Sequence, residues 1–283
     1  MNGVFFINKQ KGMTSYDVVR QIKKKFGLLK VGHTGTLDPL AEGLLLILVG
    51  KATKLNFLFS DLDKQYTGTI IFNRKYDTLD IEGKLLAESN QLLQDNMIQT
   101  VFGYFHQQKY WQNPPIYSAL KFKGQRLYHL ARKNMNIIIP SRKVFIYRLT
   151  KTSYLQNNKV DFFAHVSKGT YIRSLANDIA QKLNTYGAIA KLCRTAIGFY
   201  SLSQAQYLNQ ITLEHIIPVE KFFQNYPKII LNDYLINLVK NGIYLDERQI
   251  STHRPFVVLN KQEEMIAYYE VVAKYKYAPK YYF

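Results

Sequence analysis

Hydrophobic residues mark out the predicted strands of this chain. An uninterrupted apolar run over residues 44–49 is typical of a buried strand. Residues 64–72 form a second predicted strand. Polarity alternates over 144–155 and again over 160–166, and the two asparagines at 157 and 158 are a hairpin signal. These last two segments therefore predict a pair of antiparallel strands.

Two stretches space their apolar residues as helices do. Thr14 or Ser15 can cap a helix whose apolar stripe runs from Val18 to Phe26. Residues 172–183 repeat the same spacing and place Arg173 in the first turn of a second helix. Because the helix dipole disfavours a cation at that end, we expect an anion close to Arg173. A shorter helix is predicted over 51–59.

Residues 112–142 form an insertion between predicted strands. Their central part predicts a helix with Leu127, Leu130 and Ala131 on one face and Arg126, Arg132 and Lys133 on the other. A basic insertion edged with aromatic residues is suited to a flap that closes on nucleic acid. A solvated helical hairpin has the same charge pattern and stays open as an alternative.

The chain divides by composition near residue 225. Residues 1–225 are long enough for one large domain, and 226–283 are aromatic, with short predicted strands. The net charge of +18 is unevenly shared, because residues 1–225 hold 30 basic and 14 acidic side chains and 226–283 hold 8 and 6. A charge of this size favours a polyanionic partner such as RNA. A general lysine bias is the alternative explanation.

Other features narrow the class of protein. A single cysteine, Cys193, excludes an internal disulfide and a zinc site built from cysteines. The N-terminus lacks the pattern of a signal peptide, and the longest apolar run is too short for a membrane span. A cytoplasmic protein without membrane contact is expected.

The candidate chemistry lies in residues 31–43, directly before the apolar run. Three glycines and Pro39 make a loop in which the backbone can take positive φ and approach a ligand closely. Asp38 precedes the proline, so its backbone is restricted to extended conformations. The loop therefore holds a short carboxylate beside a rigid strand. A solvated turn aspartate is the simpler alternative.

Two further motifs give weaker signals. Residues 50–53 resemble the end of a phosphate-binding P-loop, but Leu45 stands where its first glycine belongs and alanine follows the lysine. The three carboxylates of 76–83 do not have the spacing of a calcium-binding loop, and this turn is interpreted as structural. No metal site is predicted.

The segment 32–45, Gly-His-Thr-Gly-Thr-Leu-Asp-Pro-Leu-Ala-Glu-Gly-Leu-Leu, resembles the catalytic loop of the TruB-type tRNA pseudouridine synthases. Three other segments resemble motifs of that family in the same order. Residues 9–15 resemble Lys-Pro-x-Gly-x-Thr-Ser, with Gln10 in place of the usual proline. Residues 168–173 resemble Lys-Gly-Thr-Tyr-Ile-Arg, and 192–195 resemble a third pocket segment.

The resemblance implies a role for each matching residue. Asp38 would be the nucleophile, Arg173 its ion-pair partner, and Tyr66 the tyrosine that stacks on the uracil and moves a proton. Without the resemblance, Tyr66 would be an ordinary strand aromatic. Contacts with the RNA substrate are expected from the remaining matches: His33, Tyr171, Leu192, Lys9, Lys121 and Arg126.

The same resemblance implies the fold and the reaction. We expect an α+β fold with a mixed, largely antiparallel central sheet flanked by helices, and a small β-rich PUA-like RNA-binding module at the C-terminus. The expected activity is isomerisation of the T-loop uridine at position 55 of tRNA, by a monomer without metal or cofactor. An aspartate is ionised at neutral pH and needs no base to activate it. The alternative is an RNA-binding or tRNA-folding protein on the same scaffold.

Overall fold

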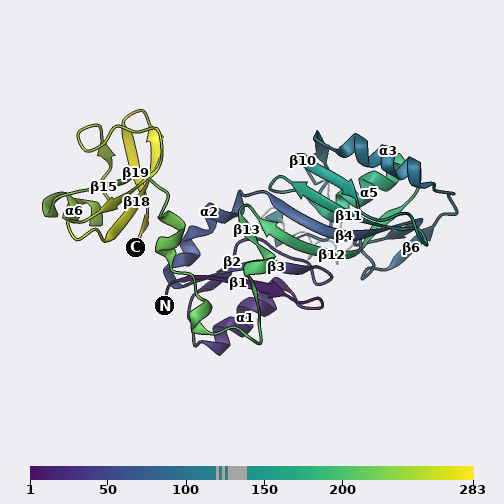
Figure 1. Ribbon diagram of the computed structural model, residues 1–283, viewed down its shortest axis with the longest axis horizontal. Coiled ribbons are helices and arrows are strands. Elements are labelled where there is room, and N and C mark those ends of the chain that lie inside the picture. Colours follow the sequence, from purple (N-terminus) through teal and green to yellow (C-terminus); the bar gives the residue numbers. More distant parts are fainter. Residues whose placement is uncertain (119–120, 123–124, 127–138) are drawn as a thin grey trace.

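The computed structural model describes residues 1–118, 121–122, 125–126 and 139–283 (Figure 1). The N-terminal strands lie between a small C-terminal sheet on one side and the part that carries α3 and α5 on the other (Figure 1). The helix predicted in the insertion, with Leu127, Leu130, Ala131, Arg132 and Lys133, lies outside the described residues.

A large mixed sheet forms the body of the molecule. Its strand order is β14-β1-β3-β12-β4-β11-β10-β7, with β2 on β3 and β13 on β12. The pairs β1/β14 and β3/β12 are parallel and the other pairs are antiparallel. The strands are β1 (Gly3–Lys9), β2 (Val31–His33), β3 (Glu42–Val49), β4 (Lys64–Phe72), β7 (Gln108–Gln112), β10 (Arg142–Lys151), β11 (Lys159–Val166), β12 (Gly187–Ile197), β13 (Tyr200–Ser201) and β14 (Gln206–Tyr207). The predicted fold class is confirmed.

Helices and two short hairpins complete the described structure. The α-helices of the described residues are α1 (Ser15–Lys25), α2 (Asn56–Ser60), α3 (Asp95–Phe105), α5 (Ile172–Lys182) and α6 (Asp233–Lys240). The 3-10 helices are Gly50–Leu55, Leu202–Gln204, Leu213–His215 and Val219–Phe223. Two small hairpins pair β5 (Arg74–Tyr76) with β6 (Leu85–Glu88) and β8 (Lys121–Phe122) with β9 (Gln125–Arg126).

Strand β3 is continuously apolar because both of its faces are buried. Leu45, Ile47 and Val49 join a core with the apolar faces of α1, α3 and α5. The alternate residues, from Leu44 to Leu48, join a second core with the 3-10 helix Val219–Phe223 and the C-terminal sheet. Successive side chains of a strand point to opposite faces, so a strand between two cores needs apolar residues at every position.

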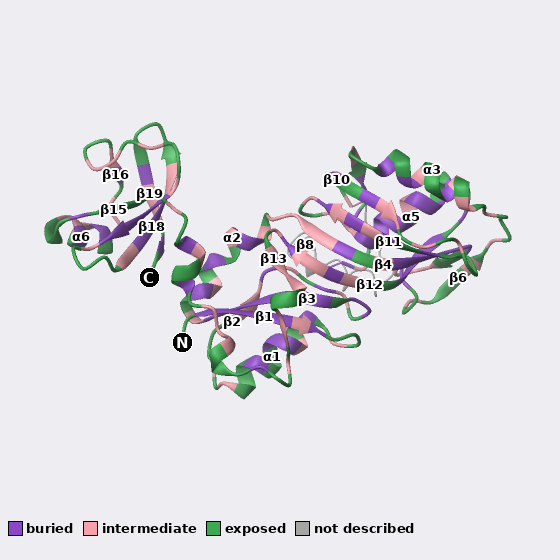
Figure 2. Cartoon of the chain, viewed as in Figure 1, coloured by how far each residue is buried: buried purple, intermediate pink, exposed green. Residues whose placement is uncertain are grey.

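The C-terminal sheet has its own helix and core but also packs on the large sheet. Its order is β15-β17-β18-β19-β16, with α6 beside it. The strands are β15 (Lys228–Ile230), β16 (Leu245–Asp246), β17 (Phe256–Leu259), β18 (Met265–Ala273) and β19 (Lys276–Tyr282). Tyr268 and Tyr281 enter the second core beside Phe223, and buried residues occur both in β1 and in β18 and β19 (Figure 2). The division near residue 225 stays a prediction.

The insertion leaves the sheet and returns to it between neighbouring strands. Gln112, at the end of β7, is the register partner of Arg142, at the start of β10. The limits predicted for the insertion, 112 and 142, therefore coincide with a cross-strand pair.

Several local predictions can be compared with the structure. Thr14 caps α1 in a capping box with Asp17. The asparagines at 157 and 158 both have positive φ, 49° and 57°, as a tight hairpin requires. The helix predicted over 51–59 is a 3-10 helix continued by α2, and β10 ends at Lys151, short of the predicted residue 155. Among the three glycines of 31–43, Gly43 alone has positive φ.

Candidate active site

Asp38 lies in the loop between β2 and β3. The loop leads into β3, whose second residue, Gly43, has a φ of 102°, and a Cβ there would lie 2.3 Å from the Arg194 carbonyl oxygen. Only a glycine lets β3 approach β12 so closely. This contact fixes the end of the Asp38 loop beside β12, where the register pairs Gly43 with Arg194.

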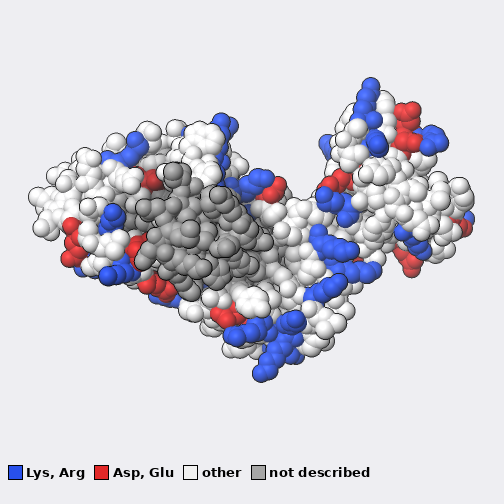
Figure 3. Space-filling model, turned by 180° about the vertical axis from the view of Figure 1, so that it is seen from behind, with Lys and Arg blue, Asp and Glu red and all other residues white. Residues whose placement is uncertain are grey.

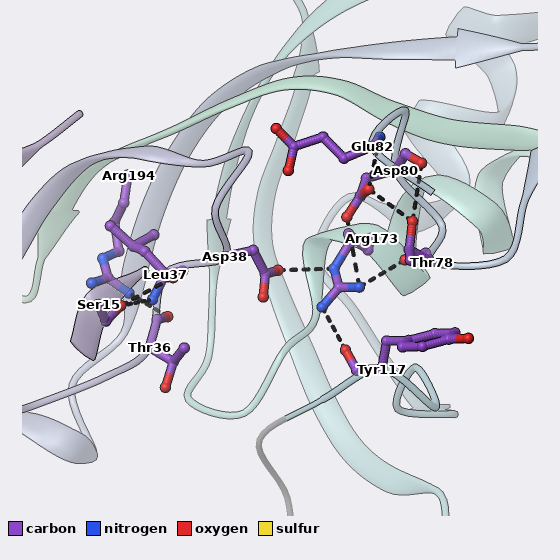
Figure 4. A network of polar contacts seen from close by, with 10 residues as sticks. All are labelled: Ser15, Thr36, Leu37, Asp38, Thr78, Asp80, Glu82, Tyr117, Arg173 and Arg194. Carbon is purple, nitrogen blue, oxygen red and sulfur yellow. Dashed lines mark hydrogen bonds and ion pairs between the residues drawn. The ribbon is translucent and has the colours of Figure 1, made fainter. Parts of the chain in front are cut away.

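Side chains from distant segments hold the backbone of this loop. Ser15 Oγ accepts a hydrogen bond from the Leu37 amide at 2.8 Å and donates one to the Leu37 carbonyl at 3.0 Å. Arg194 is 2% exposed, and its guanidinium donates to the carbonyls of Leu44 and Gly35 at 2.8 and 3.1 Å. It also donates to the Thr36 carbonyl at 3.3 Å (Figure 4). The backbone on both sides of Asp38 is therefore fixed before any ligand binds.

Arg173 joins three separate segments of the chain. Its Nε lies 2.9 Å from Oδ2 of Asp38, Nη1 donates to the Thr78 carbonyl at 2.7 Å, and Nη2 donates to the Tyr117 carbonyl at 2.9 Å (Figure 4). The side chain is 6% exposed, whereas that of Asp38 is 37% exposed. The cation in the first turn of α5 thus has the anion that the sequence led us to expect.

Asp80 is a second carboxylate close to Arg173, with Oδ2 3.7 Å from Nη1. It accepts hydrogen bonds from the Thr78 hydroxyl at 2.8 Å and the Glu82 amide at 3.1 Å. Burial raises the pKa of Asp80, while Thr78 and Arg173 act in the opposite direction. The turn interpreted as structural therefore contributes to the electrostatics of the site, which its spacing alone did not indicate.

A cavity of about 330 Å³ opens beside Asp38. Its walls include the side chains predicted to hold the base, together with groups that the sequence reasoning missed. The predicted lining residues are Asp38, Tyr66, Tyr171, Arg173 and Leu192, and the others include Thr34, Lys64, Ser118 and Arg194. Of the predicted set, these five converge on one pocket of a size that suits a small planar ligand.

The two tyrosines of the pocket come from different elements. Tyr66 lies in β4 and is 8% exposed. Tyr171 is the N-cap residue of α5, half-buried, and the guanidinium of Arg142 lies over its ring at 5.2 Å. Burial raises the pKa of Tyr171, with a smaller lowering effect from Arg142, so its hydroxyl stays protonated at neutral pH.

Lys64 is a cation of the pocket that the sequence did not single out. Burial lowers its pKa to about 8, with Arg194 the next largest cause. Its Nζ donates to the carbonyl of Ser60 at 2.9 Å and to that of Leu62. The signal available in the sequence was its position two residues before Tyr66 on the same strand.

The remaining predicted residues lie around the pocket. His33 is the last residue of β2, half-buried, next to the lining residue Thr34. Lys9 is 1% exposed, and its Nζ donates to the carbonyls of Gln10 and Met13 at 3.0 and 2.7 Å, so it supports the turn that carries Ser15. Its pKa is lowered to about 8 by burial, against the opposing charge of Asp38.

For the two residues of the insertion that are predicted to contact RNA, the structure describes only the backbone. Lys121 and Arg126 are register partners in the β8/β9 hairpin. The positions of their side chains lie outside the described residues, so their contact with RNA stays a prediction.

Neither a metal-binding cluster nor a membrane-spanning helix is found in the described part of the chain. Among these residues, no three or more of His, Cys, Asp and Glu come together as a metal site would need. None of the helices described is long and apolar enough to cross a membrane.

Comparison with known proteins gives consistent matches. Residues 23–172 match the family model described as TruB family pseudouridylate synthase (N terminal domain). Proteins named tRNA pseudouridine synthase B are 56% identical over 283 residues in Aster yellows witches'-broom phytoplasma and 47% identical in Acholeplasma laidlawii, with 100% of both chains covered in each case. The corresponding protein of Caldicellulosiruptor saccharolyticus is 37% identical, covering 99% of this chain and 98% of its own.

Solved structures share the fold. A chain of a Cbf5-Nop10-Gar1 complex superposes with a TM-score of 0.71 at 24% identity, covering 96% of this chain and 79% of the other. A chain from an H/ACA RNP bound to a substrate RNA containing 2'-deoxyuridine gives a TM-score of 0.67 at 22% identity, with 96% and 78% coverage. At these identities the likeness concerns the fold.

Proposed function

Because this chain belongs to the TruB family of pseudouridylate synthases, we propose that it converts the T-loop uridine at position 55 of tRNA to pseudouridine, with Asp38 as the nucleophile. The observation that carries the proposal is the Asp38–Arg173 ion pair at the mouth of a cavity lined by two tyrosines. Nothing in this arrangement requires a redox step, because the substrate and product are isomers.

The reaction breaks the bond between N1 of uracil and C1′ of ribose, turns the base, and forms a bond between C5 and C1′. The proton on C5 is lost and N1 gains one. Asp38 supplies the electron pair for a covalent adduct, either at C6 of the ring or at C1′ of the sugar. Arg173 keeps the carboxylate ionised and aimed while the base displaces water from the cavity. Tyr66 lies in the wall of the same cavity and is the candidate for moving the C5 proton.

Entry of the uracil requires the target nucleotide to leave its stack. Enzymes that act on a base in folded nucleic acid commonly turn it out into a closely fitting pocket. Tyr66, Tyr171 and Leu192 supply planar and apolar walls for such a base. Tyr66 and Leu192 are buried and Tyr171 is half-buried, which supports a slot whose walls are in place before a base enters.

The charge distribution supports an RNA partner. On the face shown in Figure 3, lysine and arginine side chains gather along a line that runs from the lowest part of the view, where α1 lies, toward the C-terminal sheet. Acidic side chains are fewer there. A cationic track of this kind attracts the phosphate backbone and fixes the orientation of the RNA, without reading its sequence.

The alternative, a tRNA-folding protein in which turnover is secondary, shares the same cationic surface and the same pocket. The two functions differ in their need for the Asp38 carboxylate. An RNA-folding role depends on binding and on base extrusion, whereas isomerisation depends on a nucleophile.

The decisive experiment uses purified protein and an unmodified tRNA transcript, without added cofactor. Pseudouridine should form at position 55, detected by base-specific chemical mapping. Asp38→Asn keeps the shape of the side chain but removes the nucleophile, so turnover should become undetectable while binding is retained. Pseudouridine formation by the asparagine variant, in a preparation free of host enzyme, would remove Asp38 from this role. Absence of product with the parent protein would favour the RNA-folding alternative.

A further inference from the structure

A part-buried series of hydrogen bonds runs from Asp178, in the middle of α5, back to Tyr171, the N-cap residue of that helix. The Tyr110 hydroxyl donates to Oδ2 of Asp178 at 3.0 Å, and Nε2 of Gln112 donates to the Tyr110 oxygen at 2.7 Å. The other end of the Gln112 amide meets the backbone of Tyr171. There Nε2 donates to the Tyr171 carbonyl at 3.1 Å, and Oε1 accepts from the Tyr171 amide at 2.8 Å.

Gln112 acts toward Tyr171 as a neighbouring peptide group would. Both backbone groups of Tyr171 meet one side-chain amide, which fixes the position and the tilt of that residue. Gln112 is 0% exposed, so water cannot replace either contact. Tyr171 is the N-cap of α5 and has no side-chain capping bond. The Gln112 amide therefore holds the residue at which the helix begins.

Asp178 sets the donor-to-acceptor direction of these hydrogen bonds. A carboxylate only accepts, so the Tyr110 hydroxyl must donate to it, and the tyrosine oxygen is then free to accept from Gln112. This fixes which end of the Gln112 side chain carries the NH₂ group. With the amide turned the other way, its oxygen would face the Tyr171 carbonyl and its NH₂ would face the Tyr171 amide. Two repulsive contacts would replace two hydrogen bonds.

The residue held in this way is part of the pocket. The Tyr171 ring lines the cavity, and Arg173, two residues further on, contacts Asp38. A second contact ties the same turn to the strand end, because the Ser174 hydroxyl donates to the Asn113 carbonyl at 2.7 Å. A small shift of the first turn of α5 would therefore move the tyrosine wall of the pocket and the guanidinium that aims Asp38.

We propose that Gln112, oriented by Tyr110 and Asp178, is a positioning residue for the isomerisation, because it sets the backbone of Tyr171 and through it the placement of Arg173. This inference rests on the proposed function. It concerns the chemical step and not RNA binding, since Gln112 is buried and Tyr110 and Asp178 are absent from the cavity wall. A loss of alignment should therefore appear in kcat and leave KM nearly unchanged.

The test removes the central hydroxyl of this hydrogen-bond series and leaves the packing of the side chain unchanged. Tyr110→Phe deletes one hydroxyl and keeps the ring that packs edge-on against Phe105 at 5.4 Å. We expect kcat on a T-arm stem-loop to fall about tenfold, the effect of one hydrogen bond of about 1.4 kcal/mol, with KM and RNA affinity changed less than about twofold. Asp178→Asn retains an acceptor for the tyrosine and should keep kcat near that of the parent. Asp178→Leu should behave like Tyr110→Phe.

A matched control separates positioning from general loss of stability. Thr185→Val also deletes one hydroxyl, in this case a buried one that lies away from the pocket and donates to Oδ1 of Asn73 at 2.6 Å, and it should leave kcat unchanged. Equal kcat in Tyr110→Phe and the parent, or an equal loss in Thr185→Val, overturns the inference.

A second measurement does not depend on activity. Hydrogen exchange of the Tyr171 amide should become about tenfold faster in Tyr110→Phe, because its acceptor Oε1 is no longer held in place, and it should be unaffected in Thr185→Val. Unchanged exchange in Tyr110→Phe also overturns the inference. If the parent forms no pseudouridine, the proposed function fails on its own, and the exchange result still decides whether this chain of bonds holds Tyr171.

Discussion

Replacement of Arg173 by lysine tests whether the site needs a planar fork or only a positive charge. The guanidinium makes three contacts through three different nitrogens, to Asp38 and to the carbonyls of Thr78 and Tyr117. An ammonium group is a single centre at the end of a flexible stem and cannot reach three segments at once. In Arg173→Lys, at least two of these contacts are lost while the charge is kept.

The magnitude follows from the geometry. Hydrogen bonds to a charged group contribute about 1.5–3 kcal/mol each, so two lost contacts cost about 3–6 kcal/mol before the site relaxes. Entry of water will restore part of this. If about 3 kcal/mol remains as misalignment of Asp38, the rate of the chemical step falls roughly 100-fold. RNA affinity should change less than about threefold, because the net charge is the same.

The assay is single-turnover release of tritium from a T-arm stem-loop labelled at C5 of uridine, with enzyme in excess so that binding does not limit the rate. Affinity is measured separately by filter binding. Arg148→Lys is the matched control, since Arg148 is an exposed arginine on β10 outside the pocket. A rate for Arg173→Lys within about threefold of the parent would show that charge alone suffices, and the alignment argument would be wrong.

Three further outcomes are expected. The affinity for tRNA should fall with salt at a log–log slope of roughly −0.7 to −0.9 per phosphate contacted, and a flat response in a salt titration would assign the net charge to lysine bias. Phe223→Ala should lower the free energy of unfolding by about 3–5 kcal/mol in urea denaturation, because Phe223 is 0% exposed in the core shared with the C-terminal sheet. A loss below about 1 kcal/mol would mean that this core does not unfold cooperatively with the rest of the protein. Burial raises the pKa of Asp178 to about 6, so the protonated carboxyl contributes to stability at low pH, and this contribution is lost as the pH rises through 6. The stability of Asp178→Asn relative to the parent should therefore increase between about pH 4 and about pH 7. A difference in stability that does not change with pH would contradict the assignment.

The elements that could be predicted from sequence are those governed by local pattern. The continuous apolar run gave β3, because a strand between two cores has no polar position to interrupt it. The cap at Thr14 and the paired asparagines gave a helix start and a hairpin, since both depend on neighbouring residues alone. The anion expected beside Arg173 followed from a local electrostatic cost, and the ion pair with Asp38 is the contact that offsets it.

The contacts that escaped prediction share another kind of partner. Arg194 bonds to two carbonyls of the Asp38 loop and to the Leu44 carbonyl in β3, and Gln112 bonds to the backbone of Tyr171. A carbonyl or amide carries no signature in the sequence, because every residue has one. For a side chain that binds the backbone of a distant segment, the sequence therefore shows only the residue type. Its hydrogen-bond partner can be identified only in the folded structure. Lys9 is a further example, since its ammonium donates to two nearby carbonyls, while the substrate contact implied by the family resemblance stays a prediction.

The boundary near residue 225 shows the same limit on a larger scale. Charge and composition change there, but the second core does not stop there. Phe223 stacks on Tyr281 with ring centroids 6.1 Å apart and lies 5.0 Å from Tyr268, while Phe59 of α2 contacts Phe222 edge-on at 5.2 Å. Aromatic rings bury a large apolar area in a fixed geometry, so removal of the residues after 225 would expose the apolar surface on which Tyr268 and Tyr281 pack. The Phe223→Ala experiment therefore reports whether the C-terminal sheet unfolds together with the sheet that carries Asp38. A single shared transition would mean that the sheet is held in a fixed orientation to the pocket, and that an RNA spanning both would meet a rigid surface.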